Sequence, residues 1–329
     1  MFAKLKAKFA RDPSLYYSMS VASTWAGVGA LMVGRQMLQD YGILPFLLWS
    51  LGNTLACILF GVFALRIPKL RDVFRSKPMH YLVGFMCIFQ VWTNLNGIQS
   101  IFADTPLTGT FGMFLAYSIA IGFIIMLWKY GMIRTVLSDH LAWVGVYITA
   151  FVLTIVAIIN AGGNMIPMQW GLENIGIGFE KCVLLLPGAF LYPYFFEMLD
   201  YNEQNQDGTS KTNIGLVFVK GGLLFGLFLF FTFLLSWTPF TPALSTVLAV
   251  LITLLSTVSS FLYSIYITFG RKLGLVVNIA CVACWQWLIP MGVMGVWTLM
   301  STIRIYIVIG AIIFALSWHF ATKKKAVQS

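Results

Sequence analysis

Long apolar runs separated by short polar segments follow one another along the whole chain. The ten runs, each nearly free of charged residues, cover residues 15–37, 43–65, 81–102, 111–128, 141–160, 177–199, 214–236, 242–269, 274–292 and 297–320. A helix needs about 20 apolar residues to cross the hydrocarbon core of a bilayer, so runs of this length predict membrane-spanning helices. The pattern therefore predicts an all-α, polytopic membrane protein with about ten transmembrane helices.

The composition excludes a water-soluble enzyme. Of the 329 residues, 59% are hydrophobic and 10% are charged, whereas soluble domains average about 45–50% apolar and about 25% charged residues. A soluble core does not absorb that much apolar surface. Spans of about 20 residues also leave only short connections, so no separate soluble domain is expected.

The basic residues are distributed unevenly between alternate loops. The net charge is +10, and Lys and Arg gather in the two tails and in loops such as residues 66–80. The loops in between contain no Lys or Arg; they are residues 103–110, 161–176, 238–241 and 291–296. The positive-inside rule then predicts that both termini are cytoplasmic, in a multi-pass protein of the cell (plasma or inner) membrane. The positive charge thus reflects topology, and no nucleic acid partner is expected.

The runs divide evenly about the middle of the chain, with five before residues 161–176 and five after. Because five is odd, the second half enters the membrane from the opposite side, which is the geometry of an inverted-topology repeat. The division predicts a basic tail at 1–14, repeats at 15–165 and 166–322, and a second basic tail at 323–329. Such repeats are common in transporters that bind substrate near the membrane midplane.

The opening run of each half contains residues that interrupt helices. Glycines and other small residues sit halfway along residues 20–34, and Pro187 and Pro193 flank a short segment in the second half. Unwound backbone at membrane depth is tolerated where it lines protein or a watery cavity. We therefore expect the first and sixth helices to be discontinuous. The alternative is that glycine serves close packing and proline makes a simple kink.

Three segments carry a resemblance to a known family. Residues 23–34 read STWAGVGALMVG, residues 40–52 read DYGILPFLLWSLG, and residues 255–264 read LSTVSSFLYS. The first two resemble the opening helix pair of sodium/solute symporters in the amino acid–polyamine–cation superfamily, and the third resembles that family's Ser/Thr-rich helix. The resemblance implies a five-plus-five inverted-repeat fold, here in a compact ten-helix form.

The resemblance also implies a sodium site. Its hydroxyl ligands fall on Ser256 and Thr257, and the carbonyl of Thr253 lies one turn earlier. The carbonyls of Thr24 and Gly27 complete the implied set. Sodium is a hard cation, and a cage of carbonyl and hydroxyl oxygens can replace its water. The alternative is that these hydroxyls bond to backbone carbonyls or to a neighbouring helix.

The third run carries side-chain amides that should face the interior of the bundle, because unpaired amides are costly in hydrocarbon. Gln90 and Asn94 share one helical face and are expected to hydrogen-bond a neutral or zwitterionic solute. The alternative is hydrogen bonding between helices. With the residues at the two predicted breaks, the expected substrate site consists of Trp25, Ala26, Ala30, Gln90, Asn94, Gly188 and Tyr192.

These features favour a secondary active transporter that couples a small organic solute, of the amino acid, sugar or nucleoside type, to inward sodium movement. Alternating access would rock the first, second, sixth and seventh helices against the others. Proton coupling is a subsidiary alternative. A hypothesis of another class is a channel, or a transport-inactive membrane scaffold that retains the fold.

Enzymatic activity is not expected. The three histidines show no HxxxH or HExxH spacing, and no GxxxxGK[ST] phosphate-binding loop occurs. No catalytic residue and no covalent cofactor are therefore predicted. The expected partners are the solute, sodium as the coupling ion, and the lipid bilayer; the sequence does not set an oligomeric state.

Overall fold

The computed structural model describes residues 14–103, 108–204, 213–238, 258–288 and 294–328, and these residues form helices and short connections without any β-strand. The helices are α2 (Ser14–Gln36), α3 (Ile43–Arg66), α4 (Pro68–Phe74), α5 (Lys77–Ala103), α6 (Thr108–Tyr130), α7 (Met132–Ala161), α8 (Ile175–Leu185), α9 (Pro193–Gln204), α10 (Ile214–Ser236), α12 (Val258–Phe269), α13 (Arg271–Leu288) and α14 (Met294–Gln328). Three short helical segments join them: η1 (Met37–Tyr41), η2 (Leu172–Asn174) and η3 (Gly188–Leu191).

The predicted all-α class is confirmed, and the apolar helices are consistent with the predicted membrane protein. Helix occupies part or all of every apolar run. Within the described residues, five helices are long and apolar enough to cross a bilayer by themselves: α3, α6, α7, α10 and α14. The structure extends α7 well before the predicted start of the fifth run, from residue 141 back to Met132.

The two predicted interruptions have different outcomes. α2 is continuous from Ser14 to Gln36, so the expectation of a discontinuous first helix is wrong. Glycine permits unwinding but keeps its backbone N–H donor, so it does not force a break. The sixth run does break, because α8 ends at Leu185 and α9 begins at Pro193. Pro187 and Pro193 each lack the N–H that a continuous helix requires.

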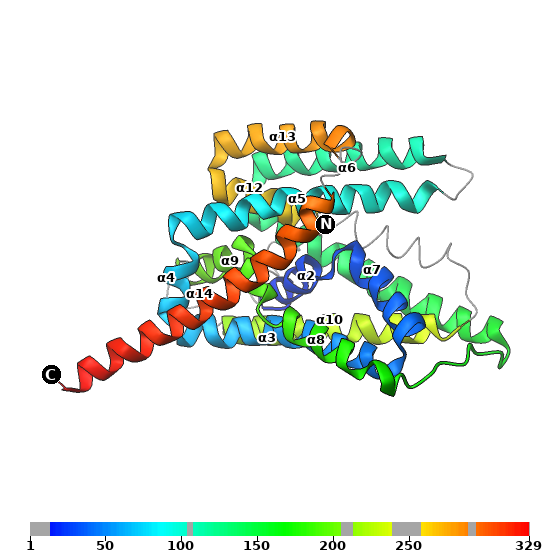
Figure 1. Cartoon of the computed structure of the whole chain (residues 1–329). Helices are drawn as coiled ribbons and strands as arrows, with labels where there is room; N and C mark the ends of the chain where they lie inside the picture. The colour runs from blue at the N-terminus through cyan, green and yellow to red at the C-terminus, as the bar shows by residue number, and fades with distance from the viewer. Residues whose placement is uncertain (1–13, 104–107, 205–212, 239–257, 289–293, 329) are drawn as a thin grey trace.

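The helices form two bundles with separate hydrophobic cores. The first bundle consists of α2, α3, α8, α9 and α10, and the second consists of α5, α6, α12 and α13. Figure 1 shows the second bundle at the top of the view and α2, α3, α8 and α10 beneath it. α7 packs against α2 and α10, and therefore extends the first bundle.

Within the bundles, particular pairs of helices pack together. α2 packs against α10 and α3 against α8, while α5 packs against α6 and α12 against α13. α2 also contacts α7, and η3 contacts α14. Between the bundles, α12 and α5 both contact α9, and α2 contacts α5. The boundary between the bundles therefore runs past α2, α9, α5 and α12.

Glycines allow the backbones of α3 and α8 to touch. A Cβ atom built on Gly52 would lie 2.7 Å from both Cα and O of Cys182, and one built on Gly178 would lie 2.5 Å from Cα of Pro45. Close approach through small residues is the usual basis of helix association in membranes, where the hydrophobic effect does not drive it. This contact holds α8 in place just before the chain breaks.

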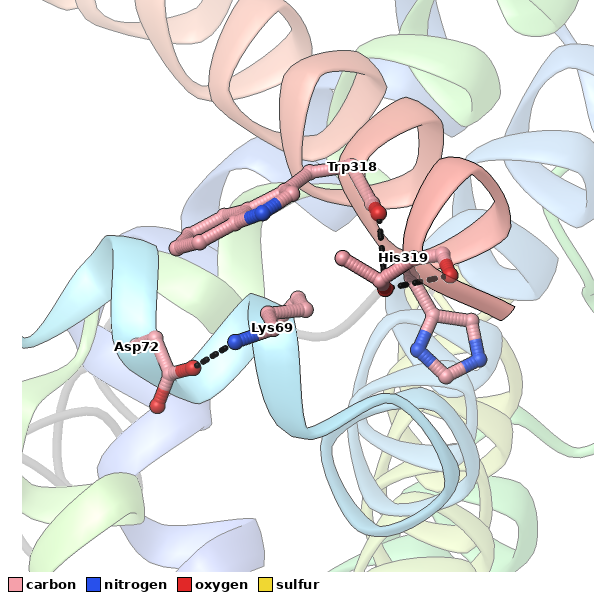
Figure 2. Close-up of polar contacts among 5 residues, drawn as sticks. Lys69, Asp72, Trp318 and His319 are labelled. Carbon is pink, nitrogen blue, oxygen red and sulfur yellow. Dashed lines mark hydrogen bonds and ion pairs between the residues drawn. The ribbon is translucent and has the colours of Figure 1, made fainter. Parts of the chain in front are cut away.

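α14 crosses the first bundle obliquely and meets α4 near its C-terminal end (Figure 1). Figure 2 shows the contact: Lys69 Nζ lies 4.1 Å from the ring centroid of Trp318 and donates a hydrogen bond to Asp72 Oδ2 at 3.2 Å. Thr322 Oγ1 donates to the Trp318 carbonyl at 3.0 Å. The cation–π contact thus joins α14 to the basic loop between α3 and α5.

Candidate functional site

A cavity of about 160 Å³ lies beside the break between α8 and α9. Four of the predicted substrate residues line it together: Trp25, Gln90, Gly188 and Tyr192. The wall also includes side chains from α3, α8, α12 and α14. None of the residues that line it in the described part of the chain carries a charge.

The aromatic wall of this cavity is held by specific contacts. Trp25 Nε1 donates to Asn53 Oδ1 at 3.1 Å, and Asn53 Nδ2 donates to the Trp49 carbonyl at 2.9 Å. A Cβ atom on Gly188 would lie 2.7 Å from Cη2 of Trp25, so glycine lets η3 lie directly against the indole. The Tyr192 ring centroid is 5.5 Å from that of Trp25. The indole is therefore held by its N–H, by η3 and by the Tyr192 ring.

Two of the other predicted substrate residues, Ala26 and Asn94, are not among the described residues that line this cavity. Ala26 is buried in the core of the first bundle. Asn94 Nδ2 donates to the Gln90 carbonyl at 2.7 Å, within its own helix. Ala30 lies in α2, but its side chain is outside the described part of the structure. The structure thus brings Trp25 and Gln90 together with the residues at the second break, whereas Asn94 contacts Gln90 without lining the cavity.

A second polar site lies around Asp139 on α7, whose side chain is fully buried. Ser20 on α2 donates to Oδ2, and Ser259 on α12 donates to Oδ1 at 3.4 Å. The Tyr194 hydroxyl, at the start of α9, lies 2.8 Å from Ser20 Oγ. Ser23 Oγ lies near the same carboxylate and has no hydrogen-bond partner among the described residues. Four elements therefore meet at one carboxylate.

A hydroxyl pair extends this cluster along α2 and α12. Thr24 Oγ1 donates to the Ser20 carbonyl at 2.8 Å and lies 2.8 Å from Ser260 Oγ. Both side chains are buried. We call Ser20, Ser23, Thr24, Asp139, Tyr194, Ser259 and Ser260 the carboxylate–hydroxyl cluster.

The cluster has the chemistry of a cation or proton site. An ionised carboxylate buried in a medium of low dielectric constant is costly unless its charge is neutralised. Within the described residues no cationic side chain forms an ion pair with Asp139. The ion pair that the described residues do form joins Lys69 and Asp72, away from this cluster. A bound proton or a hard cation would supply the missing charge. Hydroxyl and carboxylate oxygens are the ligands that hard cations prefer.

The predicted sodium ligands overlap this cluster in part. Thr24 contributes its hydroxyl to the cluster. The predicted ligands were the carbonyls of Thr24 and Gly27, but both lie in the continuous helix α2, where backbone carbonyls accept hydrogen bonds within the helix. Thr253, Ser256 and Thr257 lie outside the described residues. The next hydroxyls along the same Ser/Thr-rich segment of the sequence, at Ser259 and Ser260 on α12, join the cluster instead.

Sequence reasoning missed Asp139. The expected fifth run began at residue 141, which left the acid in a polar loop beside Arg134 and His140. A usable signal was present: no glycine or proline interrupts residues 132–144, so α7 can start directly after Gly131. Gly131 has φ +62°, a left-handed conformation that L side chains rarely adopt, and it separates α6 from α7.

The cluster and the cavity draw residues from the same helices. Two helices, α2 and α12, and the junction between η3 and α9 contribute neighbouring residues to both. In the cluster these are Thr24, Ser260 and Tyr194, next to the cavity residues Trp25, Phe261 and Tyr192. A change in the position of any of these elements therefore acts on both sites at once.

A further cavity, of about 190 Å³, is also lined in part by η3. Its wall includes Phe190 of η3, together with the polar side chains of Arg75, His80 and Glu197. Leu191 and Gly188 of the same short helix line the first cavity. η3 therefore contributes residues to both cavities.

Comparisons of this chain with protein-family models, with curated proteins and with solved structures find no match. The carboxylate–hydroxyl cluster and the adjoining cavity are therefore the basis for assigning a function.

Proposed function

We propose that this protein is a secondary transporter that couples the movement of a small solute to that of a cation, with sodium as the coupling ion. The observation that carries the proposal is that the carboxylate–hydroxyl cluster and the uncharged cavity take neighbouring residues from the same helices. An ion in the cluster and a solute in the cavity would both rest on α2 and α12. A common element of this kind gives each ligand a direct means of changing the affinity for the other.

The packing of the helices supports an inverted repeat of ten spans. We number the long helices in order, omit the short α4, and count α8, η3 and α9 as one interrupted sixth helix. The contact of the first helix with the seventh then corresponds to that of the sixth with the second. The contact of the third with the fourth corresponds to that of the eighth with the ninth. The contact of the first with the fifth corresponds to that of the sixth with the tenth. Replacing each helix by the one five positions along converts one member of each of these three pairs of contacts into the other. An inverted-topology repeat predicts this correspondence.

The two bundles supply the moving parts. The first, second, sixth and seventh helices of the proposed repeat make up the first bundle, and the cluster and cavity lie where it meets α12 and α5. A cation held by Asp139, Ser20 and Ser259 would link α7 and α2 to α12. The ion can shift the balance between inward- and outward-open states only as far as its affinity differs between them. Displacement of η3 would then join the two cavities and release the solute.

The cavity favours a small, neutral, flat solute. Its volume of about 160 Å³ is similar to that of an engineered cavity of about 150 Å³ that binds benzene. The rings of Trp25 and Tyr192 offer apolar faces, and the Gln90 amide also lines the wall. A solute with a full charge would find no charged partner among the described wall residues, so we place neutral solutes ahead of zwitterions.

The test is uptake into proteoliposomes that contain the purified full chain. A sodium gradient should drive accumulation of at least one small neutral solute in a panel of nucleobases, amino acids and sugars. Asp139→Asn should abolish gradient-driven accumulation, because an amide cannot neutralise a cation. The matched control is Asp72→Asn, an exposed acid paired with Lys69, which should leave uptake unchanged.

Other results select other functions. Accumulation driven by a proton gradient without sodium would replace sodium by the proton as coupling ion. Conductance in planar bilayers far above carrier turnover would identify a channel. If no solute in a broad panel accumulates, or if Asp139→Asn transports like the wild type, cation-coupled transport through this cluster is wrong.

A further inference from the structure

An apolar groove runs along the outer face of the second bundle, between α6 and α13. Its volume is about 450 Å³. On α13 it is lined by Leu275, Ile279 and Val282, which repeat on one helical face, and on α6 by Ile121 and Ile125. Several of these side chains are exposed, including Ile125 at 62% and Ile279 at 52%. In a membrane protein a groove of this kind faces hydrocarbon.

The groove opens at one end into a basic pocket of about 500 Å³. Trp128, near the C-terminal end of α6, lines both, so the apolar and the polar space are adjacent. The pocket carries the cations of Lys129 and Arg271 and the hydroxyls of Tyr263 and Tyr266. Glu197 is the acid among its described lining residues, so two cations face one carboxylate.

Arg271 is positioned by Trp128 on the rim between the two spaces. Its Nη2 donates to the Trp128 carbonyl at 2.7 Å, and its guanidinium carbon lies 4.7 Å from the indole ring centroid. A guanidinium has five N–H donors, so this contact leaves donors for a further acceptor. Planar N–H pairs match the oxygens of a phosphate group. Tryptophan is also typical of the level at which lipid headgroups lie.

We propose that the groove and the basic pocket together bind one anionic phospholipid. An acyl chain occupies the groove between α6 and α13, and the phosphodiester contacts Arg271 and Lys129. The groove has about three times the volume of a cavity that holds benzene, which is room for one acyl chain. The acyl chain would contact the apolar side chains of the groove, and the negative phosphodiester would lie beside the two cations of the pocket. A soluble phosphate would use the pocket and leave the apolar groove without a role.

The first test compares lipids that share acyl chains and differ in headgroup. The purified full chain is placed in nanodiscs of phosphatidylcholine with or without phosphatidylglycerol, and bound lipid is counted by native mass spectrometry alongside thermal unfolding. The wild type should retain phosphatidylglycerol in preference to phosphatidylcholine and unfold at a higher temperature with it. Arg271→Gln should weaken the retention of phosphatidylglycerol roughly tenfold, because a charge-assisted contact is lost.

The matched control is Lys272→Gln. Lys272 is the next residue on α13, is exposed, and does not line the pocket. If general attraction between a basic surface and anionic lipid is the cause, both variants lose preference equally, and the proposed site is wrong. Arg271→Gln also removes the bond to Trp128, so the decisive quantity is the difference between the two lipids within each variant. Arg271→Lys, which keeps the charge, should restore part of that difference.

A second pair of variants tests the groove. Ile279→Trp fills it and should reduce retention of both lipids, while Val276→Trp adds the same bulk at an exposed position that does not line it. Equal behaviour of these two variants would overturn the acyl-chain half of the proposal. If inorganic phosphate alone at millimolar concentration reproduces the stabilisation by phosphatidylglycerol, the pocket binds a soluble anion and the lipid proposal is wrong.

Discussion

The contact between α3 and α8 at Gly52 gives the sharpest prediction for stability. A Cβ atom at this position would lie 2.7 Å from Cα and from O of Cys182, and 3.1 Å from its carbonyl carbon. All three are backbone atoms, so no rotation of a side chain can relieve the overlap. Carbon atoms pack best at about 3.5–4.0 Å, so Gly52→Ala requires α8 to move away from α3 by about 0.8–1.3 Å.

This displacement has a cost that can be compared with a control. Overpacking of a well-packed core destabilises by about 1–3 kcal/mol, and we expect the upper part of that range because two helix backbones must separate. Gly122→Ala on α6 is the matched control, since a Cβ there meets nothing within 4 Å. Replacing glycine by alanine inside an unobstructed helix stabilises by up to about 1 kcal/mol. The two variants should therefore shift stability in opposite directions.

Thermal unfolding of the purified variants in one detergent measures the difference. Gly52→Ala should unfold below the wild type and Gly122→Ala at or above it. Because α8 also supplies Leu184 and Leu185 to the cavity wall, Gly52→Ala should weaken solute binding as well. If Gly52→Ala unfolds at the same temperature as Gly122→Ala, the backbones of α3 and α8 are not in contact at this point and the packing of the first bundle described above is wrong.

Two further substitutions probe the sites themselves. Trp25→Phe keeps a flat ring but leaves Asn53 Oδ1 without its donor, so it should lower the free energy of unfolding by about 1–3 kcal/mol; an unchanged denaturant midpoint would contradict the 3.1 Å bond. Tyr194→Phe removes a hydroxyl that lies 2.8 Å from Ser20 Oγ. It should raise the sodium concentration for half-maximal uptake several-fold without abolishing transport, because Asp139 remains. An unchanged sodium dependence would remove Tyr194 from the ion site.

The sequence was sufficient for features that depend on the residues themselves. The bounds of α10, Ile214–Ser236, agree with the apolar run at 214–236, because the length and apolarity of a segment decide whether it can cross a bilayer. The break between α8 and α9 was equally accessible, since Pro187 and Pro193 remove backbone donors wherever they occur. The continuous α2 shows the limit of the same reasoning, because a glycine allows a break without imposing one.

The sequence was insufficient for features that depend on which helices meet. Asp139 looks like an interfacial acid in the sequence, and it becomes a buried site only because Ser20 on α2 and Ser259 on α12 pack around it. Gln90 and Asn94 share a helical face in the sequence pattern, yet Gln90 lines the cavity while the Asn94 amide bonds to its own helix. Neither distinction follows from periodicity, because both depend on long-range packing.

The adjacency of the two sites limits how the proposed transporter can work. Ion and solute would both rest on α2 and α12, with Thr24 and Ser260 on one side and Trp25 and Phe261 on the other. If the bound ion raises the affinity for solute by some factor, the bound solute must raise the affinity for the ion by the same factor. A shift of α2 against α12 would weaken both sites together, so release of one ligand would promote release of the other. Coupling in this protein then needs no long pathway between distant sites, because the same short segments of α2 and α12 hold both ligands.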